Sequence, residues 1–388
     1  MISLNKTVLI DGVRTPIGRF KGSFSRNTAT ELGTATVSEL IRRYPEFTQA
    51  DGVILGQVIQ AGQGQNPARQ VAVNAGIDIN TPALTLNSVC IASLAAVSDA
   101  ARRIERGEGD LFVVGGFESM TNAPHVSNLR REVKMGAVEF YDTLNDGLWC
   151  ALSDQSMGGL SEKTNRELQI SREEQDEYAL TSQLRAAKAQ SAGIFRDEIV
   201  GVNVSGKLLT EDECIRPQTS LQKLQNLQPA FEAGGTITAG NASQMSDGAS
   251  AGLISSLDTC EKIGKSPLAT IVDWSFVAGP DPSLHLQPAN AIKALLNRRN
   301  LRLSDIDLFE INEAFASVVI ASQRDLGLPS DVVNVNGGAI ALGHPLGASG
   351  FRLVLTLALE LKRRGGGRGI ASMCGGGGQG AAILIEVD

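Results

Sequence analysis

The pattern of apolar and polar positions predicts an α/β protein in which two parts of the chain repeat one order of elements. A strand-like run over residues 83–89 leads into residues 91–106, where apolar side chains recur at helical spacing. A strand-like run over 111–114 follows. The same order recurs later, with a helix over 349–364 and a strand over 369–373. We therefore expect two similar α/β units whose loops meet at one shared site.

The other periodic segments frame an excursion between these units. They are strands over 7–10, 308–311 and 381–387 and helices over 28–43 and 67–75. The intervening region is more polar and irregular, with one clear helix that begins at a capping box of Ser171 and Glu174. The pattern predicts three units, namely an N-terminal core over 1–119 that is completed by about 245–269, an inserted loop domain over 120–244, and a C-terminal core over 270–388.

Composition and charge limit the classes of function. The chain has 388 residues, 42% of them hydrophobic, which is enough for a large core. Its net charge of −7 argues against bulk affinity for nucleic acid, so an anionic substrate would need a local basic site. No apolar run reaches membrane-spanning length, and residues 1–6 carry no signal-peptide pattern. We expect a cytoplasmic protein with no membrane partner.

The cysteines and histidines argue against disulfides and metal. The five cysteines are scattered without paired spacing, which is typical of reduced thiols in a cytoplasm. The three histidines lie far apart and no Cys-x-x-Cys occurs, so we expect no metal site. Three cysteines fit small buried or surface residues, and these are Cys150, Cys214 and Cys260.

Cys90 lies where a strand-like run gives way to a helix-like one. Unpaired N–H groups and the helix dipole at such a junction favour a thiolate, which is the nucleophilic form of cysteine. Free cysteine is also commonly a small buried hydrophobe. From Cys90 alone, the catalytic and the structural interpretation both stay open.

Cys374 is followed by four glycines, and His344 lies between two glycines with a proline after it. Bare backbone after Cys374 lets a substrate press against the main chain and lets N–H groups point at it. His344 is the natural base for a cysteine nucleophile, and we favour that interpretation. Asn312 follows the strand over 308–311, and there we favour a helix N-cap over a catalytic amide. Two thiols and one imidazole together indicate covalent acyl transfer.

Two further motif matches are weak. The spacing of Gly375, Gly377 and Gly380 fits a dinucleotide fingerprint, but a strand-like run follows it instead of a helix, so we reject it. Gly248-Ala-Ser250-Ala-Gly252 fits the elbow of a serine hydrolase, with Asp273 and His344 downstream in the right order. The residues before it are turn-like, so Ser250 remains only an alternative nucleophile.

Several short motifs in a fixed order, spread over nearly the whole chain, resemble the thiolase family, and most closely its acetyl-CoA acetyltransferases. They are Val13-Arg14-Thr15-Pro16-Ile17-Gly18, Gly116-Phe117-Glu118-Ser119-Met120, Thr238-Ala239-Gly240-Asn241-Ala242-Ser243, Asn312-Glu313-Ala314-Phe315-Ala316, Gly343-His344-Pro345 and Cys374-Gly375-Gly376. The resemblance implies a five-layered, duplicated α/β sandwich with an inserted loop domain.

The resemblance also implies roles for individual residues. Cys90 would carry the acyl group after His344 takes its proton, and Cys374 would move the proton of the acetyl-CoA methyl group. Asn312 would hold a water that, with His344, stabilises the enolate oxygen, while the N–H groups of Cys90 and Gly376 form the other oxyanion hole. Four residues would contact the substrate, with Arg216 and Ser243 at coenzyme A and Met157 and Phe315 along the acyl pocket.

The implied reaction is a reversible ping-pong condensation of two acetyl-CoA to acetoacetyl-CoA, or thiolysis of a 3-ketoacyl-CoA. Coenzyme A is then a substrate or product and no separate cofactor is needed. Residues 122–136 resemble the tetramerisation loop of biosynthetic members, so a homotetramer, or else a dimer, is expected. Alternatives are a longer-chain degradative 3-ketoacyl-CoA thiolase, a ketoacyl synthase, a silent CoA-binding scaffold, and a serine hydrolase using Ser250.

Departures from the family pattern leave acyl-chain preference open. They include Ile91 and Ser93, after the proposed nucleophile, and Ser156, where acetoacetyl-specific relatives often have histidine. Ile91, Met157 and Phe315 predict a narrow tunnel for short chains, whereas the small Ser156 opposes this.

Overall fold

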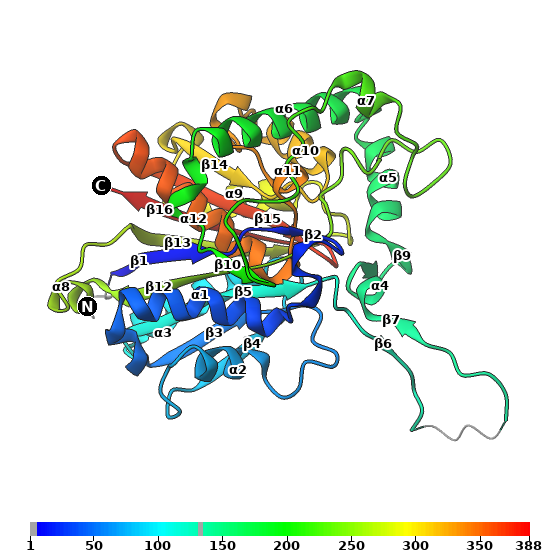
Figure 1. The fold of residues 1–388 in the computed structure, drawn as a ribbon. Helices are drawn as coiled ribbons and strands as arrows, with labels where there is room; N and C mark the ends of the chain where they lie inside the picture. The colour runs from blue at the N-terminus through cyan, green and yellow to red at the C-terminus, as the bar shows by residue number, and fades with distance from the viewer. Residues whose placement is uncertain (1–5, 131–134) are drawn as a thin grey trace.

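The computed structural model describes residues 6–130 and 135–388, and ten of the strands in these ranges form one mixed sheet (Figure 1). The order across the sheet is β14-β15-β16-β13-β1-β12-β5-β3-β4, with β2 beside β12. The strands are β1 (Thr7–Arg14), β2 (Gly18–Arg19), β3 (Gly52–Gly56), β4 (Ala83–Leu86), β5 (Leu111–Ser119), β12 (Ser246–Ser256), β13 (Ala269–Ala278), β14 (Leu308–Ile311), β15 (Gly367–Gly375) and β16 (Gln379–Val387).

The sheet has an N-terminal half and a C-terminal half. Helices lie between the two halves and over the outer face of each, which gives five layers. The main helices are α1 (Ala29–Arg43), α2 (Pro67–Asn74), α3 (Ala92–Arg106), α8 (Leu257–Lys262), α9 (Gln287–Arg299), α10 (Ala316–Leu326), α11 (Ala339–Leu342) and α12 (Leu346–Arg364). Helices α3 and α12 lie in the middle, with strands of both halves packed against them. Helices α1 and α2 cover the outer face of the N-terminal half, and α9 and α10 that of the C-terminal half. The duplicated sandwich expected from the sequence is confirmed.

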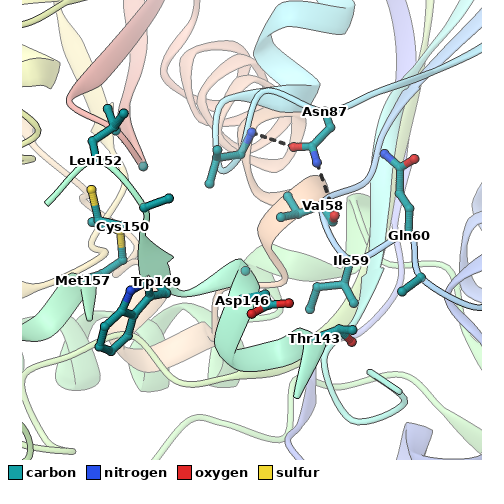
Figure 2. Close-up of a pocket in the computed structure, with 16 residues that line it drawn as sticks. Val58, Ile59, Gln60, Asn87, Thr143, Asp146, Trp149, Cys150, Leu152 and Met157 are labelled. Atoms are coloured by element: carbon teal, nitrogen blue, oxygen red, sulfur yellow. Dashed lines mark hydrogen bonds between the residues drawn. The ribbon is translucent and has the colours of Figure 1, made fainter. Parts of the chain in front are cut away.

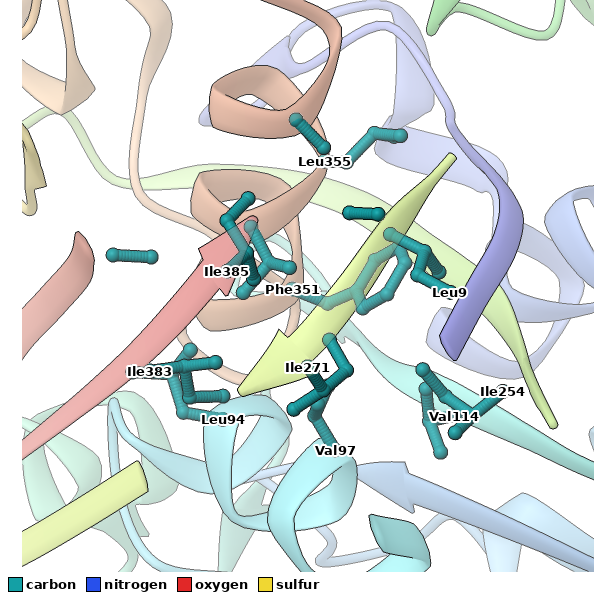
Figure 3. Packing of buried hydrophobic residues seen from close by; sticks show 14 of the residues in the cluster. Leu9, Leu94, Val97, Val114, Ile254, Ile271, Phe351, Leu355, Ile383 and Ile385 are labelled. Carbon is teal, nitrogen blue, oxygen red and sulfur yellow. The ribbon is translucent and has the colours of Figure 1, made fainter. Parts of the chain in front are cut away.

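Helix α12 is buried along almost its whole length, and Phe351 anchors it (Figure 3). The Phe351 ring lies over strands β1 and β12, where Gly12 and Gly252 leave room for it. A Cβ at Gly252 would come within 2.1 Å of the ring. Small residues in the strands are therefore what lets the central helix approach the sheet.

Most predicted elements occur, but several strands are longer than predicted. The strand predicted over 111–114 continues to Ser119, although Gly115 and Gly116 indicated an end. A Cβ at Gly116 would lie 2.0 Å from the carbonyl oxygen of Gly347, so this glycine permits close approach of the α12 N-terminus. Glycine here marks tight packing rather than a turn.

The polar region between the halves forms short elements and one long helix over the C-terminal half. These are β6 (His125–Val126), β7 (Tyr141–Asp142), α4 (Thr143–Gly147), β8 (Trp149–Cys150), β9 (Gln155–Ser156), α5 (Met157–Glu167), α6 (Arg172–Ser191), β10 (Val202–Val204), β11 (Lys207–Leu209) and α7 (Leu221–Gln225). The capping box of Ser171 and Glu174 that begins α6 is confirmed. The division of the chain into three units stays a prediction.

Buried ion pairs and an arm complete this region. The Arg14 guanidinium, from β1, pairs with Glu198 at 2.7 Å and with Asp212 at 2.7 Å, so it fastens the intervening region to the core. An arm projects from the body, and β6 and β7 pair at its base (Figure 1). Part of the predicted tetramerisation loop, residues 131–134, lies outside the described residues. Within the described ranges, no helix is long and apolar enough to cross a membrane.

Candidate active site

Cys90 lies on the turn between β4 and α3, one residue after a strained backbone position. Val89 has a φ of 50°, a left-handed conformation that β-branched residues rarely adopt. The Asn87 side chain holds this turn, because its Oδ1 accepts the Val89 N–H at 2.9 Å and its Nδ2 donates to the Val58 carbonyl at 3.3 Å (Figure 2). The conformation places the Cys90 thiol immediately before the first turn of α3.

The Cys90 thiol is protonated in the resting site. Burial raises its pKa to about 11, although the N–H groups of Gly376 and of Cys90 itself oppose the rise. The helix start therefore does not produce a resting thiolate, as the sequence had suggested, because loss of solvation outweighs it. A base must remove the proton when the thiol reacts.

Cys374 is the last residue but one of β15, and the glycine loop after this strand brings two catalytic candidates together. Burial raises the pKa of the Cys374 thiol far above its usual range, and the neighbouring Cys90 raises it further. The N–H of Gly376 is close enough to the Cys90 thiol to lower its pKa. Gly378 has a φ of 72°, and a Cβ there would lie 2.1 Å from the Asp281 carbonyl oxygen, so the turn requires glycine. The loop thus joins β15 to β16 and presents an N–H donor to the nucleophile.

His344 lies in the loop between α11 and α12, and its hydrogen bonds define a base. Nδ1 lies 2.6 Å from the Ser349 hydroxyl oxygen, while that hydroxyl donates to the Pro345 carbonyl at 2.8 Å. Ser349 therefore accepts from Nδ1–H, and Nε2 carries the free lone pair. Burial, helped by the positive Arg352, lowers the pKa of His344 to about 3, so the ring is neutral.

Asn312 follows β14 and faces the free nitrogen of His344. Its Nδ2 lies 3.5 Å from His344 Nε2, and its Oδ1 is buried without a hydrogen-bond partner among the described residues. An orphaned buried amide oxygen beside a neutral imidazole is a suitable place for a water or a substrate oxygen. The predicted N-cap role is wrong, because α10 begins at Ala316 with Phe315 as its N-cap residue.

One cavity, here called the His344 cavity, gathers the predicted substrate residues. It has a volume of about 530 Å³, and His344, Arg216, Ser243, Met157 and Phe315 all line it. Met157 and Phe315 also pack against Cys374 in one apolar cluster. The cavity therefore connects the imidazole, and two apolar residues of the Cys374 cluster, with the exposed cation of Arg216. The Nη2 of Arg216 donates to the Gln244 side chain at 3.0 Å.

Sequence reasoning missed Glu118 and Ser349. The buried Glu118 carboxylate accepts the N–H groups of Val58 at 3.0 Å, Ile59 at 3.1 Å and Gly347 at 3.0 Å. It thereby ties β5 to the start of α12, just beyond His344, and burial raises its pKa to about 7. Its position in a family motif at the end of a strand was the available signal.

The three departures from the family pattern have structural roles. Ile91 is buried in the central core beneath Gly375, so the expectation that it narrows the acyl tunnel is wrong. The Ser93 hydroxyl accepts the Phe351 N–H at 3.0 Å and so links α3 to α12. Ser156 caps α5 by accepting the Gly159 N–H at 3.1 Å.

Ser250 is not placed as a nucleophile. It lies within β12, between β1 and β5, and its side chain is 1% exposed. Its hydroxyl donates to the Ala348 carbonyl at 2.6 Å. Asp273 pairs with Arg298 instead of orienting His344. The serine-hydrolase alternative is therefore wrong, because the small residues around Ser250 form a central strand and not an elbow.

Comparison with known proteins gives one consistent result. Residues 7–258 match the family model "Thiolase, N-terminal domain", and residues 265–387 match "Thiolase, C-terminal domain". The chain is 46% identical over 393 residues to a probable acetyl-CoA acetyltransferase of Mycobacterium leprae, with 99% of this chain and 100% of that protein covered.

Two solved structures have the same fold. Human mitochondrial 3-ketoacyl-CoA thiolase in complex with CoA superposes with a TM-score of 0.96 at 39% identity, covering 99% of this chain and 98% of that chain. The Bacillus anthracis acetyl-CoA acetyltransferase superposes with a TM-score of 0.96 at 37% identity, covering 99% of each chain.

Proposed function

The chain belongs to the thiolase family, and from that premise we propose that it is an acetyl-CoA C-acetyltransferase that works through an acyl-thioester on Cys90. The observation that carries this proposal is the placement of the half-buried Cys90 thiol and the buried Cys374 thiol beside Gly376, with a neutral imidazole on the same cavity as Met157 and Phe315. Relatives named acetyl-CoA acetyltransferase support the choice of substrate.

In the first half-reaction, the Cys90 sulfur attacks the carbonyl carbon of acetyl-CoA. His344 Nε2 accepts the thiol proton, and the N–H groups of Cys90 and Gly376 stabilise the oxyanion. The bond to the coenzyme A sulfur breaks, and that sulfur leaves with the proton from His344. The low pKa of His344 favours this return, since a buried imidazolium beside Arg352 is unstable.

In the second half-reaction, His344 Nε2 accepts the proton of Cys374, and the thiolate so formed takes a proton from the methyl group of another acetyl-CoA. Asn312, through a water, and His344 stabilise the enolate oxygen. The enolate carbon attacks the acetyl carbon on Cys90, the carbon–sulfur bond breaks, the Cys90 sulfur takes the proton from His344, and acetoacetyl-CoA leaves. In thiolysis the same steps run backwards, and Cys374 as thiol protonates the departing carbon.

Labelling tests the proposal directly. Incubation with radiolabelled acetyl-CoA, followed by acid quench and digestion, should place the label on the peptide that contains Cys90. Iodoacetamide should abolish turnover, while a serine-directed phosphonate should not. Label on another residue, or no label under turnover conditions, would contradict the assignment.

Arg216 and Ser243 are the proposed contacts for coenzyme A. Both line the mouth of the His344 cavity, and Lys223 lines a smaller neighbouring cavity that also contains Arg216. Two cations beside a channel suit a phosphorylated ligand in a chain of negative net charge.

We further propose a homotetramer assembled through the arm. Leu129, Met135 and Phe140 on the arm are 60%, 95% and 63% exposed, an apolar surface that fits contact with another copy. Light scattering of Met135→Glu should give a smaller particle than the unaltered protein. An unchanged mass would show that the arm is not part of the interface.

The five free cysteines favour a cytoplasmic location, which fractionation of the producing cell would test.

A further inference from the structure

We propose that Arg352 and Glu310 form a positioning pair for the second half-reaction, which fixes Asn312 opposite His344 and so builds the place that stabilises the enolate oxygen. This inference rests on the proposed function and adds two residues to it. Neither Arg352 nor Glu310 is among the residues that line the His344 cavity, so both act through other residues rather than on the substrate.

The ion pair joins the two elements that carry these groups. Arg352 lies on α12, the helix that begins directly after the His344 loop, and Glu310 lies on β14, two residues before Asn312. The Arg352 Nη1 donates to the Glu310 Oε2 at 3.3 Å, and each side chain is 3% exposed. The pair therefore links α12 to β14 close to the point where Asn312 Nδ2 and His344 Nε2 lie 3.5 Å apart.

The alternation of side chains along β14 places Glu310 and Asn312 on one face. Phe309 and Ile311 pack in the outer cluster with α9. The Asn312 N–H donates to the Ser372 carbonyl of β15 at 3.0 Å, so the extended backbone continues past the end of β14. Because successive side chains of a strand point to opposite faces, Glu310 and Asn312 both face α12. A shift of Glu310 relative to α12 would therefore move Asn312 with it.

The side of α12 that carries Arg352 also holds the imidazole. Ser349 accepts from His344 Nδ1–H, and Arg352 follows Ser349 by three residues, so both side chains lie on one face of the helix. Both also line a small cavity of about 10 Å³ together with Pro345. A continuous set of contacts thus runs from the imidazole through α12 to the ion pair, and from the ion pair through β14 to Asn312.

The pair is poorly suited to a purely stabilising role. Burial raises the pKa of the Glu310 carboxyl to about 8, although Arg352 opposes the rise, so the charged form is costly there. The Arg352 Nη2 is buried without a hydrogen-bond partner among the described residues. Apolar residues of similar size are often as stabilising as a buried ion pair, but they supply no directed contact between two elements. The directed contact is what the site requires.

Arg352 also acts on His344 through its charge. Charged groups nearby are Glu310 on β14, Arg14 on β1 at the same small cavity, and Glu198 beside the next turn of α12. The positive charge of Arg352 adds to burial in lowering the pKa of His344. Loss of this charge should let the imidazole bind a proton at higher pH, and a protonated imidazole cannot accept the proton of Cys374.

Replacement of the pair by apolar residues separates positioning from stability. The double variant Glu310→Leu with Arg352→Met should melt close to the unaltered protein and should acylate Cys90 within about tenfold of its rate. Its formation of acetoacetyl-CoA should fall roughly 10²-fold, because a displacement of about 1 Å at a reacting group costs that much. Single-turnover release of coenzyme A and production of acetoacetyl-CoA measure the two half-reactions. Condensation at the unaltered rate, or an equal fall in both half-reactions, would overturn the proposal.

A second background shows whether the pair acts through Asn312. In Asn312→Ala, which lacks the amide, the same apolar replacement should slow condensation less than about threefold further. The comparison is made at pH 8, where His344 is neutral. A merely structural pair would cost the same factor in both backgrounds, and that result would overturn the proposal. Arg43→Met, which breaks the Arg43–Asp11 pair at 3.1 Å between α1 and β1, is the matched control and should leave the ratio of the two half-reactions unchanged.

Arg352→Lys tests the pair without apolar residues, should the double variant fail to fold. Lysine keeps the charge, so Arg352→Lys should recover condensation at least about tenfold relative to Arg352→Met. The acid limb of kcat against pH should stay in place in Arg352→Lys and should move to higher pH by about one pH unit in Arg352→Met. Equal rates in the two variants would overturn the proposal, as would coincident acid limbs.

The outcomes also separate this inference from the proposed function. No acetoacetyl-CoA from the unaltered protein would contradict the proposed function itself. An active unaltered protein whose condensation is insensitive to replacement of the pair would overturn the positioning role alone.

Discussion

The two halves of the core share one architecture but contribute different chemistry to the site. The N-terminal half brings one reacting group, Cys90, on a turn that Val89 holds in a left-handed conformation. The C-terminal half brings Asn312, His344 and Cys374, each next to the end of a regular element. The bond-forming sulfur therefore lies on one half and the proposed proton-handling groups lie on the other. Duplication of the fold has therefore not duplicated the proposed chemistry, which draws on groups from both halves.

Of the changes proposed here, removal of the nucleophile should lower activity most. Cys90→Ala should lower kcat for both half-reactions by on the order of 10⁵-fold, because no thioester can form. Single-turnover release of coenzyme A from acetyl-CoA measures the first half-reaction. Cys260→Ala, which alters a buried thiol of the outer core, is the control. Substantial coenzyme A release by Cys90→Ala would show that the sulfur chemistry does not belong to the N-terminal half.

A change of the second thiol should slow one half-reaction much more than the other. Cys374→Ser should leave the acylation of Cys90 nearly intact but slow carbon–carbon bond formation by roughly 10²–10⁴-fold, since a hydroxyl is a poor proton shuttle. Acylation is followed by mass spectrometry and condensation by acetoacetyl-CoA production. Cys214→Ser serves as the control at a buried thiol away from Cys374. Equal loss of both half-reactions would refute the separation.

The pH dependence of stability should have opposite signs for one group from each half. Glu118 has its pKa raised to about 7, so the folded state holds the proton more tightly, and stability falls as pH rises from about 4.5 to about 7. His344 has its pKa lowered to about 3, so stability falls as pH drops from about 6.5 towards 3.

Urea unfolding of Glu118→Gln and His344→Gln across pH 4 to 8 measures both effects. Each substitution should remove its own slope, worth up to about 3 kcal/mol at Glu118. A Glu118→Gln curve parallel to that of the unaltered protein would mean that Glu118 titrates normally. Such a result would leave the tie between β5 and α12 intact at all of these pH values.

The smallest effect should come from Arg216, which belongs to neither half. Arg216→Ala should raise KM for acetyl-CoA about tenfold with little change in kcat, because a cation–phosphate contact at the cavity mouth is the same in ground and transition states. Arg196→Ala, exposed and away from the cavities, is the control. A fall in kcat alone would assign Arg216 to the reaction rather than to binding.

Helices were easier to predict than strands. Residues 28–43, 91–106 and the helix at Ser171 follow from periodicity and caps, because both are local properties of the sequence. The strand that contains Ser250 was not predicted, and the residues before Ser250 appeared turn-like, since the serines and glycines of this strand have low strand propensity. Those residues are small because α12 presses on them, as at Gly252 against Phe351. A contact between segments that are distant in the sequence therefore determines the residue types of this strand, and the local pattern does not reveal it.

The site shows the same contrast between local features, which the sequence displays, and features that depend on distant segments. Cys90, His344 and Cys374 carry reactive groups in distinctive loops, so their positions could be identified from the sequence. The raised pKa of Cys90 and the hydrogen bonds of Glu118 depend on burial and on neighbours from other elements, which one sequence does not display. At Ile91 the sequence was misleading. Its position next to Cys90 suggested a residue of the acyl tunnel, but in the structure it is a core residue.

The N–H of Gly376 that faces the Cys90 sulfur has a consequence for the newly made chain. Cys90 leaves the ribosome long before Gly376, and during that interval its thiol lacks both this donor and the imidazole of His344. In the unfinished chain it is an ordinary cysteine with a pKa of about 8.5 and no activating partner. By the proposed mechanism, acyl transfer therefore begins only when β15 and β16 have joined the sheet, and a partly folded chain does not consume acetyl-CoA.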